Sequence, residues 1–520
     1  MQHYNLYILS FIALFMIGFF FRDYEGTKKG KIIDYSFCFA IACIVSTTFN
    51  LSPFNQYLTN QDSSVFLYIG ERMKEGAIPY RDLFDHKGIF LYFIQLLGVS
   101  LPFDNYTGVW ILEIVNMTLT IVLLFKVTGL FTEKKIVRYA SLIAVFLVCG
   151  FQFYAGGNYT EEWALPWISI AMYIFLKYLK EGKYTFSEII WLGAAFSIVA
   201  LLRINMVTIW MVMLPVVLIQ MLSARQYADL FQCIKGFVLG IMIIVIPVLI
   251  YTCITGCLDD MIYCYIEFNF AYSDDAGSWS NIISSIIKYA KLIPFAVVSV
   301  LVTLIPCRNN KLYLINFLVL AVSLPFTFMS GRFDLNYGIV LLPYLVPFFV
   351  CTIEVLYRLA EKIVKLELPL KFMENKLLIV AMGVVVFVAF HIQSDEIFLT
   401  AKAEEIRDYI EETTNESDDV LILGSQGMNY YFLSDRRTDN KYFYQFPPLK
   451  ISDDLCVDFL REMNDKPSDT IIVLESRDYW LDREDNLGII YDFLENKVSE
   501  GEYICEDSEE FFTYHRVQTN

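Results

Sequence analysis

Apolar stretches of helical length follow one another through the first 393 residues of this 520-residue chain. Most of them hold close to twenty residues with almost no charge, which is about the length that a helix needs to cross a hydrocarbon layer of ~30 Å. With 56% hydrophobic residues and a mean hydropathy of +0.48, the chain is too apolar for a soluble enzyme. The sequence therefore predicts a polytopic α-helical membrane protein.

The basic residues between the apolar stretches set the expected orientation. Loops rich in Lys and Arg alternate along the chain with loops that are poor in both. Because cytoplasmic loops carry the excess of Lys and Arg, this alternation predicts about twelve spans with both termini outside. The expected spans lie near residues 4–21, 32–50, 106–125, 139–154, 163–179, 188–202, 206–222, 236–254, 286–305, 312–329, 338–357 and 376–392.

The segment between the second and third spans, at about residues 60–104, is expected to form two helices that lie on the outer membrane surface. In residues 63–76 the apolar and charged side chains fall on different helical faces. Residues 89–104 are apolar but too few to cross, and Pro102 ends the helical pattern. This segment and the chain after residue 393 should lie on the same outer side.

Residues 394–520 differ in composition from residues 1–393. From Gln393 onward the chain has 31 acidic and 12 basic residues, whereas the part before it is nearly neutral. Strand-like and helical patterns alternate there, which predicts a small acidic extracytoplasmic α/β domain. Its acidity excludes nucleic-acid binding, because phosphate backbones need clustered Lys and Arg. Whether Cys456 and Cys505 form a disulfide stays open.

The outer loop after the second span carries the groups that could act on a lipid-borne substrate. Asp62 should sit just above the membrane face, where a carboxylate can take a proton from an incoming hydroxyl. Lys87 can hold a phosphate as a point charge. A plainer interpretation is that such charges only cap helices or reach from the membrane surface into water. The other charged candidates in this loop are Arg81, Asp82, Asp85 and His86.

The stretch Asp62 … Gly76-Ala77-Ile78-Pro79-Tyr80-Arg81-Asp82-Leu83-Phe84-Asp85-His86-Lys87-Gly88 resembles the first outer loop of the GT-C fold glycosyltransferases. The likeness is to the bacterial relatives of protein O-mannosyltransferases and lipid A aminoarabinose transferase. In this family an acidic residue acts as the base and a later Lys contacts the lipid phosphate, which implies Asp62 and Lys87 here. The chain departs from the family pattern in having Ser63 where Glu is frequent and Gly88 where Pro is usual.

Three later loops extend the resemblance. Gly156–Trp163 resembles the second outer loop, whose acidic residue organises the site or a metal, and this implies Glu161 or Glu162. An equal alternative is that both acids only stabilise the start of a helix. The turn with Arg203 resembles a basic turn between two spans, where a lipid phosphate is a suitable partner. The third loop contributes Arg332 and Tyr337. If Mg²⁺ or Mn²⁺ is used, its ligands would be Asp62 and Glu161 or Glu162.

The resemblance implies an inverting glycosyltransferase that moves a sugar from a polyprenyl-phosphate donor to an extracytoplasmic acceptor. The acceptor would be a glycan such as a surface polysaccharide or teichoic acid, a lipid or a protein. One alternative is a polysaccharide polymerase or ligase, which the absence of Lys, Arg and His from residues 256–281 disfavours. Another is a transporter or flippase of lipid-linked saccharides, which would place ionisable residues in mid-span.

Overall fold

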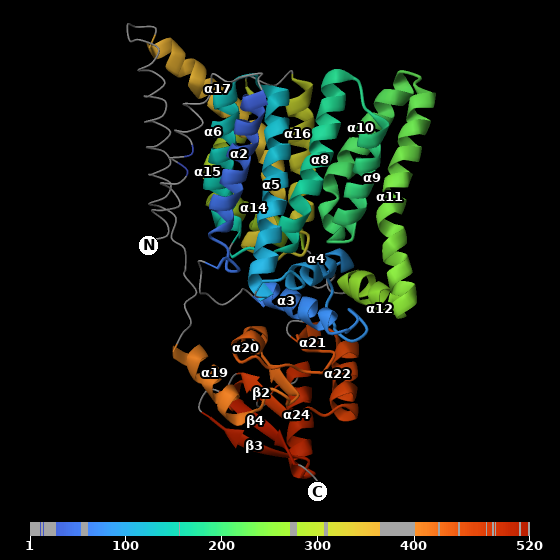
Figure 1. Cartoon of the computed structure of the whole chain (residues 1–520), viewed down its shortest axis with the longest axis vertical. Coiled ribbons are helices and arrows are strands. Elements are labelled where there is room, and N and C mark those ends of the chain that lie inside the picture. The colour runs from blue at the N-terminus through green and yellow to red at the C-terminus, as the bar shows by residue number, and fades with distance from the viewer. Residues whose placement is uncertain are drawn as a thin grey trace. The chain divides into compact units, whose positions relative to one another are not determined.

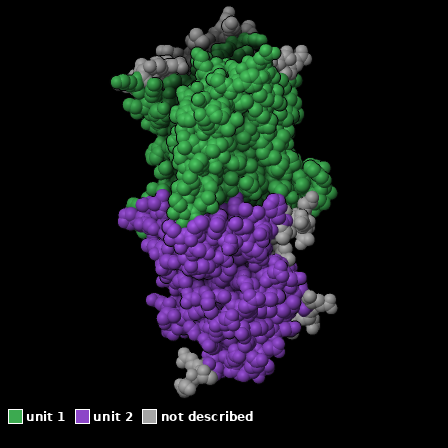
Figure 2. All heavy atoms as spheres, turned by 90° about the vertical axis from the view of Figure 1, so that its right-hand side faces the viewer, with its two compact units in different colours: residues 1–55, 103–250, 276–395 green, residues 56–102, 251–275, 396–520 purple. Residues whose placement is uncertain are grey.

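The computed structural model describes residues 28–53, 61–103, 105–154, 156–270, 278–305, 310–364, 401–424, 427–445, 448–474, 476–480, 483, 485–508 and 511–517, with Phe11 and Leu14. The chain forms two compact units, which are coloured separately in Figure 2. Unit 1 comprises residues 1–55, 103–250 and 276–395, and unit 2 comprises residues 56–102, 251–275 and 396–520. Three segments that are distant in sequence therefore build unit 2.

Unit 1 is a set of helices, and each of the expected spans from 32–50 to 338–357 contains one or more of them (Figure 1). The expected spans 376–392 and 4–21, except Phe11 and Leu14, lie outside the described residues. The helices are α2 (Lys28–Ser46), α5 (Asn105–Phe131), α6 (Lys135–Val145), η2 (Phe146–Gly150), α7 (Phe151–Tyr154), α8 (Thr160–Glu181), α9 (Phe186–Ala200), η3 (Ile204–Met206), α10 (Thr208–Ser223), α11 (Tyr227–Thr255, its last turn in unit 2), α14 (Trp279–Leu292), α15 (Pro294–Leu304), α16 (Lys311–Thr327), η5 (Leu335–Leu341) and α17 (Leu342–Val364).

Within the described residues, three helical stretches are long and apolar enough to cross a membrane: Thr107–Phe131, Tyr227–Thr255 and Leu335–Leu359. A fourth is the pair α14–α15, if it counts as one span despite a bend of 95°. The break falls at Pro294, which has no N–H to continue the hydrogen bonding of α14. The helical membrane fold is confirmed, while the count of about twelve spans stays a prediction.

Close helix packing holds unit 1 together. α5 packs against α2 and α8, and α17 packs against α5, α6 and α15. α9 and α11 meet backbone to backbone, since a Cβ at Gly193 would overlap the Phe237 carbonyl and one at Gly240 would overlap the Ile190 carbonyl. Small residues permit such an approach between helices in a membrane, where dispersion contacts replace the hydrophobic effect.

Unit 2 joins the helices that follow the second expected span to the C-terminal α/β region (Figure 1). The helices expected at residues 63–76 and 89–104 are present as α3 and α4. The elements are α3 (Gln61–Lys74), α4 (Ile89–Val99), α12 (Leu258–Ile262), η4 (Tyr263–Glu267), α19 (Ala401–Thr413), β1 (Val420–Leu423), α20 (Gly427–Leu433), α21 (Pro448–Ile451), α22 (Asp453–Asp465), β2 (Thr470–Leu474), α23 (Arg477–Trp480), α24 (Asn486–Ser499), β3 (Tyr503–Asp507) and β4 (Phe511–Arg516).

The small C-terminal sheet is confirmed, with strand order β1-β2-β4-β3. β1 and β2 are parallel, with Val420 opposite Thr470, and β4 runs antiparallel to both of its neighbours. Every residue of β1 and β2 is buried, as expected where both faces of a parallel pair are covered. Cys456 and Cys505 are both unbridged thiols.

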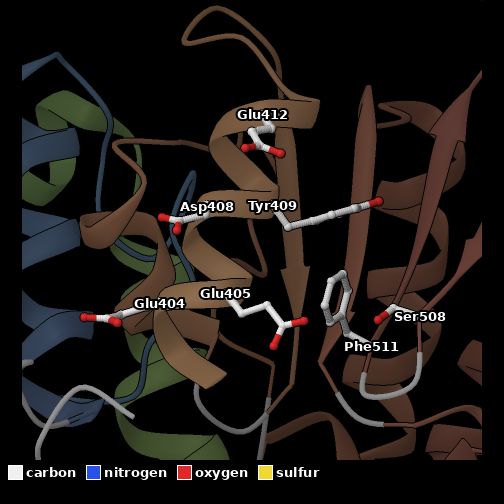
Figure 3. A pocket seen from close by; sticks show the side chains of 7 residues that line it. All are labelled: Glu404, Glu405, Asp408, Tyr409, Glu412, Ser508 and Phe511. Carbon is white, nitrogen blue, oxygen red and sulfur yellow. The ribbon is translucent and has the colours of Figure 1, made fainter. Parts of the chain in front are cut away.

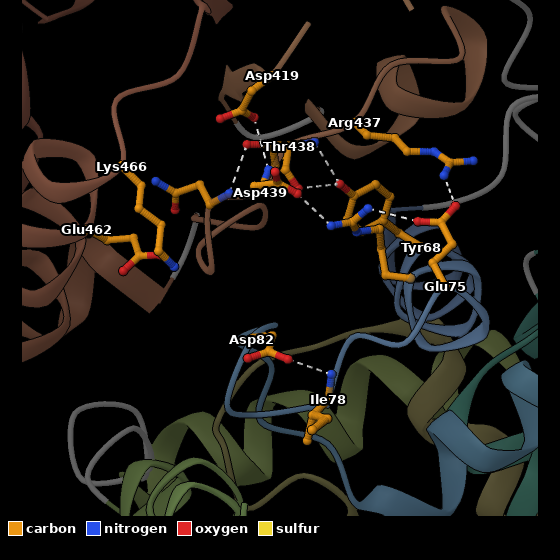
Figure 4. A network of polar contacts seen from close by, with 12 residues as sticks. Tyr68, Glu75, Ile78, Asp82, Asp419, Arg437, Thr438, Asp439, Glu462 and Lys466 are labelled. Atoms are coloured by element: carbon orange, nitrogen blue, oxygen red, sulfur yellow. Dashed lines mark hydrogen bonds and ion pairs between the residues drawn. The ribbon is translucent and has the colours of Figure 1, made fainter. Parts of the chain in front are cut away.

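Helix α3 is bonded to the chain that follows α20 (Figure 4). The Tyr68 hydroxyl donates to the Thr438 carbonyl at 3.2 Å and accepts from the Thr438 N–H at 3.0 Å. The Arg72 guanidinium lies 2.8 Å from the Asp439 carboxylate, and Arg437 pairs with Glu75. Arg72 on the charged face of α3 thus has a partner in the C-terminal region, a contact that the helical pattern alone does not indicate.

Replacing Tyr68 by Phe should destabilise unit 2. The change leaves the buried N–H and carbonyl of Thr438 without their hydrogen bonds to the Tyr68 hydroxyl. An unsatisfied buried polar group costs about 1–3 kcal/mol. We expect a lower Tm for the purified protein in detergent. Tyr227→Phe is the matched control, because that side chain is 62% exposed. Equal Tm values for the two variants would show that the Tyr68 hydroxyl contributes nothing.

Glu71 should make the stability of unit 2 depend on pH. Burial raises its pKa to about 7, although Arg437 opposes the rise. Between about pH 4.3, the ordinary pKa of Glu, and pH 7 the folded protein keeps a proton that the unfolded chain loses, so stability falls as pH rises. Glu71→Gln should flatten this slope in Tm measured from pH 4.5 to 8. If Tm depends on pH in the same way in the unchanged protein and in Glu71→Gln, the pH dependence does not come from Glu71.

Candidate functional site

Asp62 lies in the first turn of α3 and is partly exposed. The next two residues are buried, and Ser64 donates from its hydroxyl to the Asn429 side chain at 2.8 Å. The Asp62 carboxylate is near enough to Asp85 to contribute to the rise in the pKa of that group. The start of α3 is thus fixed against the C-terminal region while its first acid remains accessible.

The loop before α4 is folded tightly around the backbone of Lys87. Tyr80 is fully buried with φ +68°, a strained conformation for a large side chain, and its N–H donates to the Leu83 carbonyl at 2.8 Å. Its hydroxyl donates to the Lys87 carbonyl at 2.7 Å, and the Tyr92 hydroxyl lies 3.2 Å from the same oxygen. Two buried phenols therefore hold the backbone of the proposed phosphate contact.

Asp85, His86 and Lys87 form a connected polar chain. The buried Asp85 carboxylate accepts from the His86 N–H at 2.7 Å and from the Tyr92 hydroxyl at 2.8 Å. Burial raises the pKa of Asp85, and the nearby Lys87 charge opposes this. The Lys87 ammonium lies 2.9 Å from His86 Nε2. An ammonium only donates, so Nε2 is the acceptor and the ring proton is on Nδ1, 3.8 Å from the Asp85 carboxylate.

Arg81 and Asp82 form an ion pair. The Arg81 guanidinium donates two bonds to the Asp82 carboxylate, at 2.8 and 2.9 Å, and a third to the Thr255 carbonyl at 3.1 Å. Asp82 also accepts from the Ile78 N–H at 2.8 Å. These partners give the pair a role in shaping the loop, beside the substrate-binding role that the sequence predicts for it.

In unit 1 the structure brings Glu161, Arg203 and Tyr337 together. Arg203, in the turn between α9 and α10, donates to the buried Glu161 carboxylate, and its Cζ lies 4.7 Å from the Tyr337 ring centre. Asn336 donates to the other Glu161 oxygen at 3.3 Å, a contact missed by the sequence analysis. Arg332 lies in the segment between α16 and η5, where its N–H donates to the Ser330 hydroxyl.

Glu162 belongs to a second buried group. The Asn158 N–H is shared between Glu113 at 2.5 Å and Glu162 at 3.0 Å, and both carboxylates are fully buried. Gly157, at φ +79°, allows this approach, since a Cβ there would overlap Glu113 and Phe49. Two charged carboxylates that lie this close together away from water repel each other strongly. Glu113 was not among the residues predicted from the sequence. A carboxylate inside the apolar stretch 106–125 is unusual and could have indicated it.

Two of the predicted metal ligands, Glu161 and Glu162, are bonded to other groups of the protein. Among the described residues, no three His, Cys, Asp or Glu side chains come together as possible ligands of one ion. Glu161 is bonded to Arg203 and Asn336, and Glu162 shares the Asn158 N–H with Glu113.

Two cavities lie within unit 2. The larger, of about 580 Å³, is lined by one side of α19 together with Ser508 and Phe511 (Figure 3). The Tyr409 and Phe511 rings are 4.7 Å apart, and the carboxylates of Glu404, Glu405, Asp408 and Glu412 are at the surface. The second, of about 420 Å³, lies between the loop before α4, α12–η4 and α22.

The fold has been seen before in solved structures. The crystal structure of ArnT from Cupriavidus metallidurans bound to undecaprenyl phosphate has a TM-score of 0.60 at 10% sequence identity, over 94% of this chain and 99% of that one. Its apo form gives a TM-score of 0.57 at 10% identity, over 94% and 98%. The chain is therefore an integral membrane protein with the GT-C fold, and the predicted resemblance is confirmed.

The sequence places the chain in a particular family. The family model described as the N-terminal domain of the putative competence-induced protein Ccs4 matches residues 24–397, so the chain belongs to this family. No curated protein sequence matches the chain.

The contact between Glu161 and Arg203 predicts an asymmetric response to substitution. Glu161→Gln leaves a largely buried guanidinium without its counter-charge, and breaking such a pair costs about 3–5 kcal/mol. The double variant Glu161→Gln/Arg203→Gln should recover part of the lost Tm. At the exposed pair of Glu354 and Arg358, Glu354→Gln should cost only about 0–1 kcal/mol. A double variant less stable than Glu161→Gln alone would contradict the coupling.

Proposed function

We propose that the chain is an inverting membrane glycosyltransferase, which transfers a sugar from a polyprenyl-phosphate donor to an acceptor outside the cytoplasm. The observation that carries the proposal is that a single compact unit contains Asp62 and Lys87, both partly exposed, on either side in sequence of the strained Tyr80 loop. The GT-C fold, shared with a protein solved with undecaprenyl phosphate, supports the same class of donor.

In the proposed reaction Asp62 is the base. The acceptor hydroxyl gives its proton to the Asp62 carboxylate while its oxygen bonds to the anomeric carbon of the donor sugar. The bond from that carbon to the phosphate oxygen breaks, its electron pair stays on oxygen, and polyprenyl phosphate leaves. Attack on the face opposite the leaving group inverts the anomeric centre.

Lys87 is the proposed partner of the departing phosphate. A positive charge held in place before the reaction stabilises the negative charge that grows on the leaving group. The fixed Lys87 carbonyl and the His86 contact limit how far the ammonium can move. Arg203 uses part of its guanidinium on Glu161, and because Arg carries five N–H donors, others can serve a phosphate. Arg332 and Tyr337 remain proposed substrate contacts.

Two substitutions test these roles. Asp62→Asn should reduce sugar transfer by about 10²–10⁴-fold, as expected for loss of a general base. Lys87→Ala should weaken donor binding, because the phosphate loses its cation. Asp229→Asn is the control, since Asp229 is an exposed acid in the first turn of α11. Purified protein is incubated with a panel of polyprenyl-phosphate sugars and cell-envelope acceptors, with and without a chelator.

Each of the following results would contradict one part of the proposal. Full transfer by Asp62→Asn removes that residue from the role of base, and unchanged donor affinity in Lys87→Ala removes the phosphate contact. Exchange of labelled lipid-linked saccharide across vesicles, without any sugar transfer, would instead indicate a transporter. Labelling of a cysteine at position 62 from the cytoplasmic side would contradict the orientation.

A further inference from the structure

The smaller cavity of unit 2 is open to solvent and is lined by aromatic, acidic and basic side chains. Three segments line it: the loop before α4 supplies Phe84, α12–η4 supplies Asp260 and Tyr263, and the C-terminal region supplies the rest. Its volume of about 420 Å³ falls in the ~300–1,000 Å³ range of small-molecule sites. The Phe84 N–H donates to the Lys441 carbonyl at 2.9 Å, which joins the first and last of these segments.

Aromatic rings form a rigid base for the cavity. Phe84 and Tyr442 are buried with ring centres 5.4 Å apart, and Phe84 also packs edge-on against Phe268. The Tyr442 hydroxyl donates to the Asp458 carboxylate, so the ring cannot easily turn. Tyr263 lies at the rim and is 37% exposed, which leaves part of its ring available to a ligand. The exposed part of the Tyr263 ring offers an apolar face to the C–H groups of a sugar, whereas Phe84 and Tyr442 are buried and support the site from beneath.

The rim provides both acceptors and donors of hydrogen bonds. Three carboxylates line it, from Asp260, Asp454 and Asp458, together with the cations of Lys441 and Arg461. Lys441 lies 3.9 Å from Asp260, and Arg461 lies 3.1 Å from Asp458. Sugar hydroxyls donate and accept, so they suit a rim of this kind. A phosphate group suits it less, because both cations already face carboxylates and the acids outnumber them.

We propose that this cavity binds an uncharged sugar unit of the acceptor, so that the acceptor is a glycan. This proposal rests on the proposed function and extends it. Phe84 directly precedes the Asp85-His86-Lys87 chain, and the cavity and that chain belong to the same compact unit. A glycan held in the cavity is thereby bound by the unit that carries Asp62, the proposed base.

The experiment measures glycan binding directly on the full-length protein in nanodiscs. The probe is an array of uncharged oligosaccharides of glucose, galactose, rhamnose and N-acetylglucosamine, with inorganic phosphate as a competitor. At least one oligosaccharide should bind, and phosphate should not displace it. Tyr263→Ala and Asp454→Asn should each weaken this binding about tenfold, by loss of a stacked ring or of a charged acceptor.

Matched controls are Tyr479→Ala and Asp492→Asn, an exposed tyrosine and an exposed acid of unit 2 outside the cavity lining, which should bind as the unchanged protein does. Binding of no oligosaccharide, binding that survives both cavity substitutions, or displacement by phosphate overturns the inference. Consumption of polyprenyl-phosphate sugars by the unchanged protein is measured separately. If no donor is consumed, the proposed function fails, whereas the binding result still decides the nature of the cavity.

Discussion

The paired hydrogen bonds between Tyr68 and Thr438 are the contact on which the arrangement of unit 2 depends. They join a helix near the start of the chain to a segment 370 residues later, and they are made in a buried setting where an unmet polar group is costly. Because the Thr438 segment is itself bonded to β1, through the Val420 N–H and the Arg437 carbonyl, α3 is tied to the sheet. The segment of residues 61–99 is thus part of the same compact unit as the C-terminal sheet.

The bonds between this loop and the C-terminal region can hold a reactive group in a fixed position. Loops move unless their backbone groups are bonded, and a site that is loose by about 1 Å loses much of its effect. The loop that carries Lys87 is fixed by two phenols, by the Phe84 bond to Lys441 and by Asn269, whose side chain donates to the His86 carbonyl at 2.7 Å. Such rigidity is consistent with a site that is ordered before substrate arrives.

Much of the fold followed from local pattern. The period of the apolar residues located the helices of unit 1, and the alternation of strand-like and helical patterns predicted the small C-terminal α/β region. The pattern could not reveal contacts between distant segments. Local spacing does not predict which segment contacts α3. It also does not predict the contacts of Glu161 with Arg203 and Asn336.

The sequence likewise predicted some residues of the candidate site and not others. Asp62 and Lys87 were predicted from their place in the loop after the second span and from the resemblance to the GT-C glycosyltransferases, and their roles stay predictions. The structure adds Tyr80 and Tyr92, which carry no charge and look like ordinary aromatic residues in sequence. Glu113 was overlooked because the surrounding helix is apolar, although its burial beside Glu162 gives the Gly156–Asn158 loop its shape.

The strand order of the sheet has a consequence for biosynthesis. β4, at Phe511–Arg516, lies between β2 and β3 and is made after both, so the sheet stays open until these residues have emerged from the ribosome. Contacts between segments far apart in sequence form slowly, because a long loop must close first. The apolar helices can enter the bilayer as they are synthesised, but unit 2 cannot be completed before the last strand is made. A chain that ends before β4 would therefore be inserted and yet lack a complete unit 2.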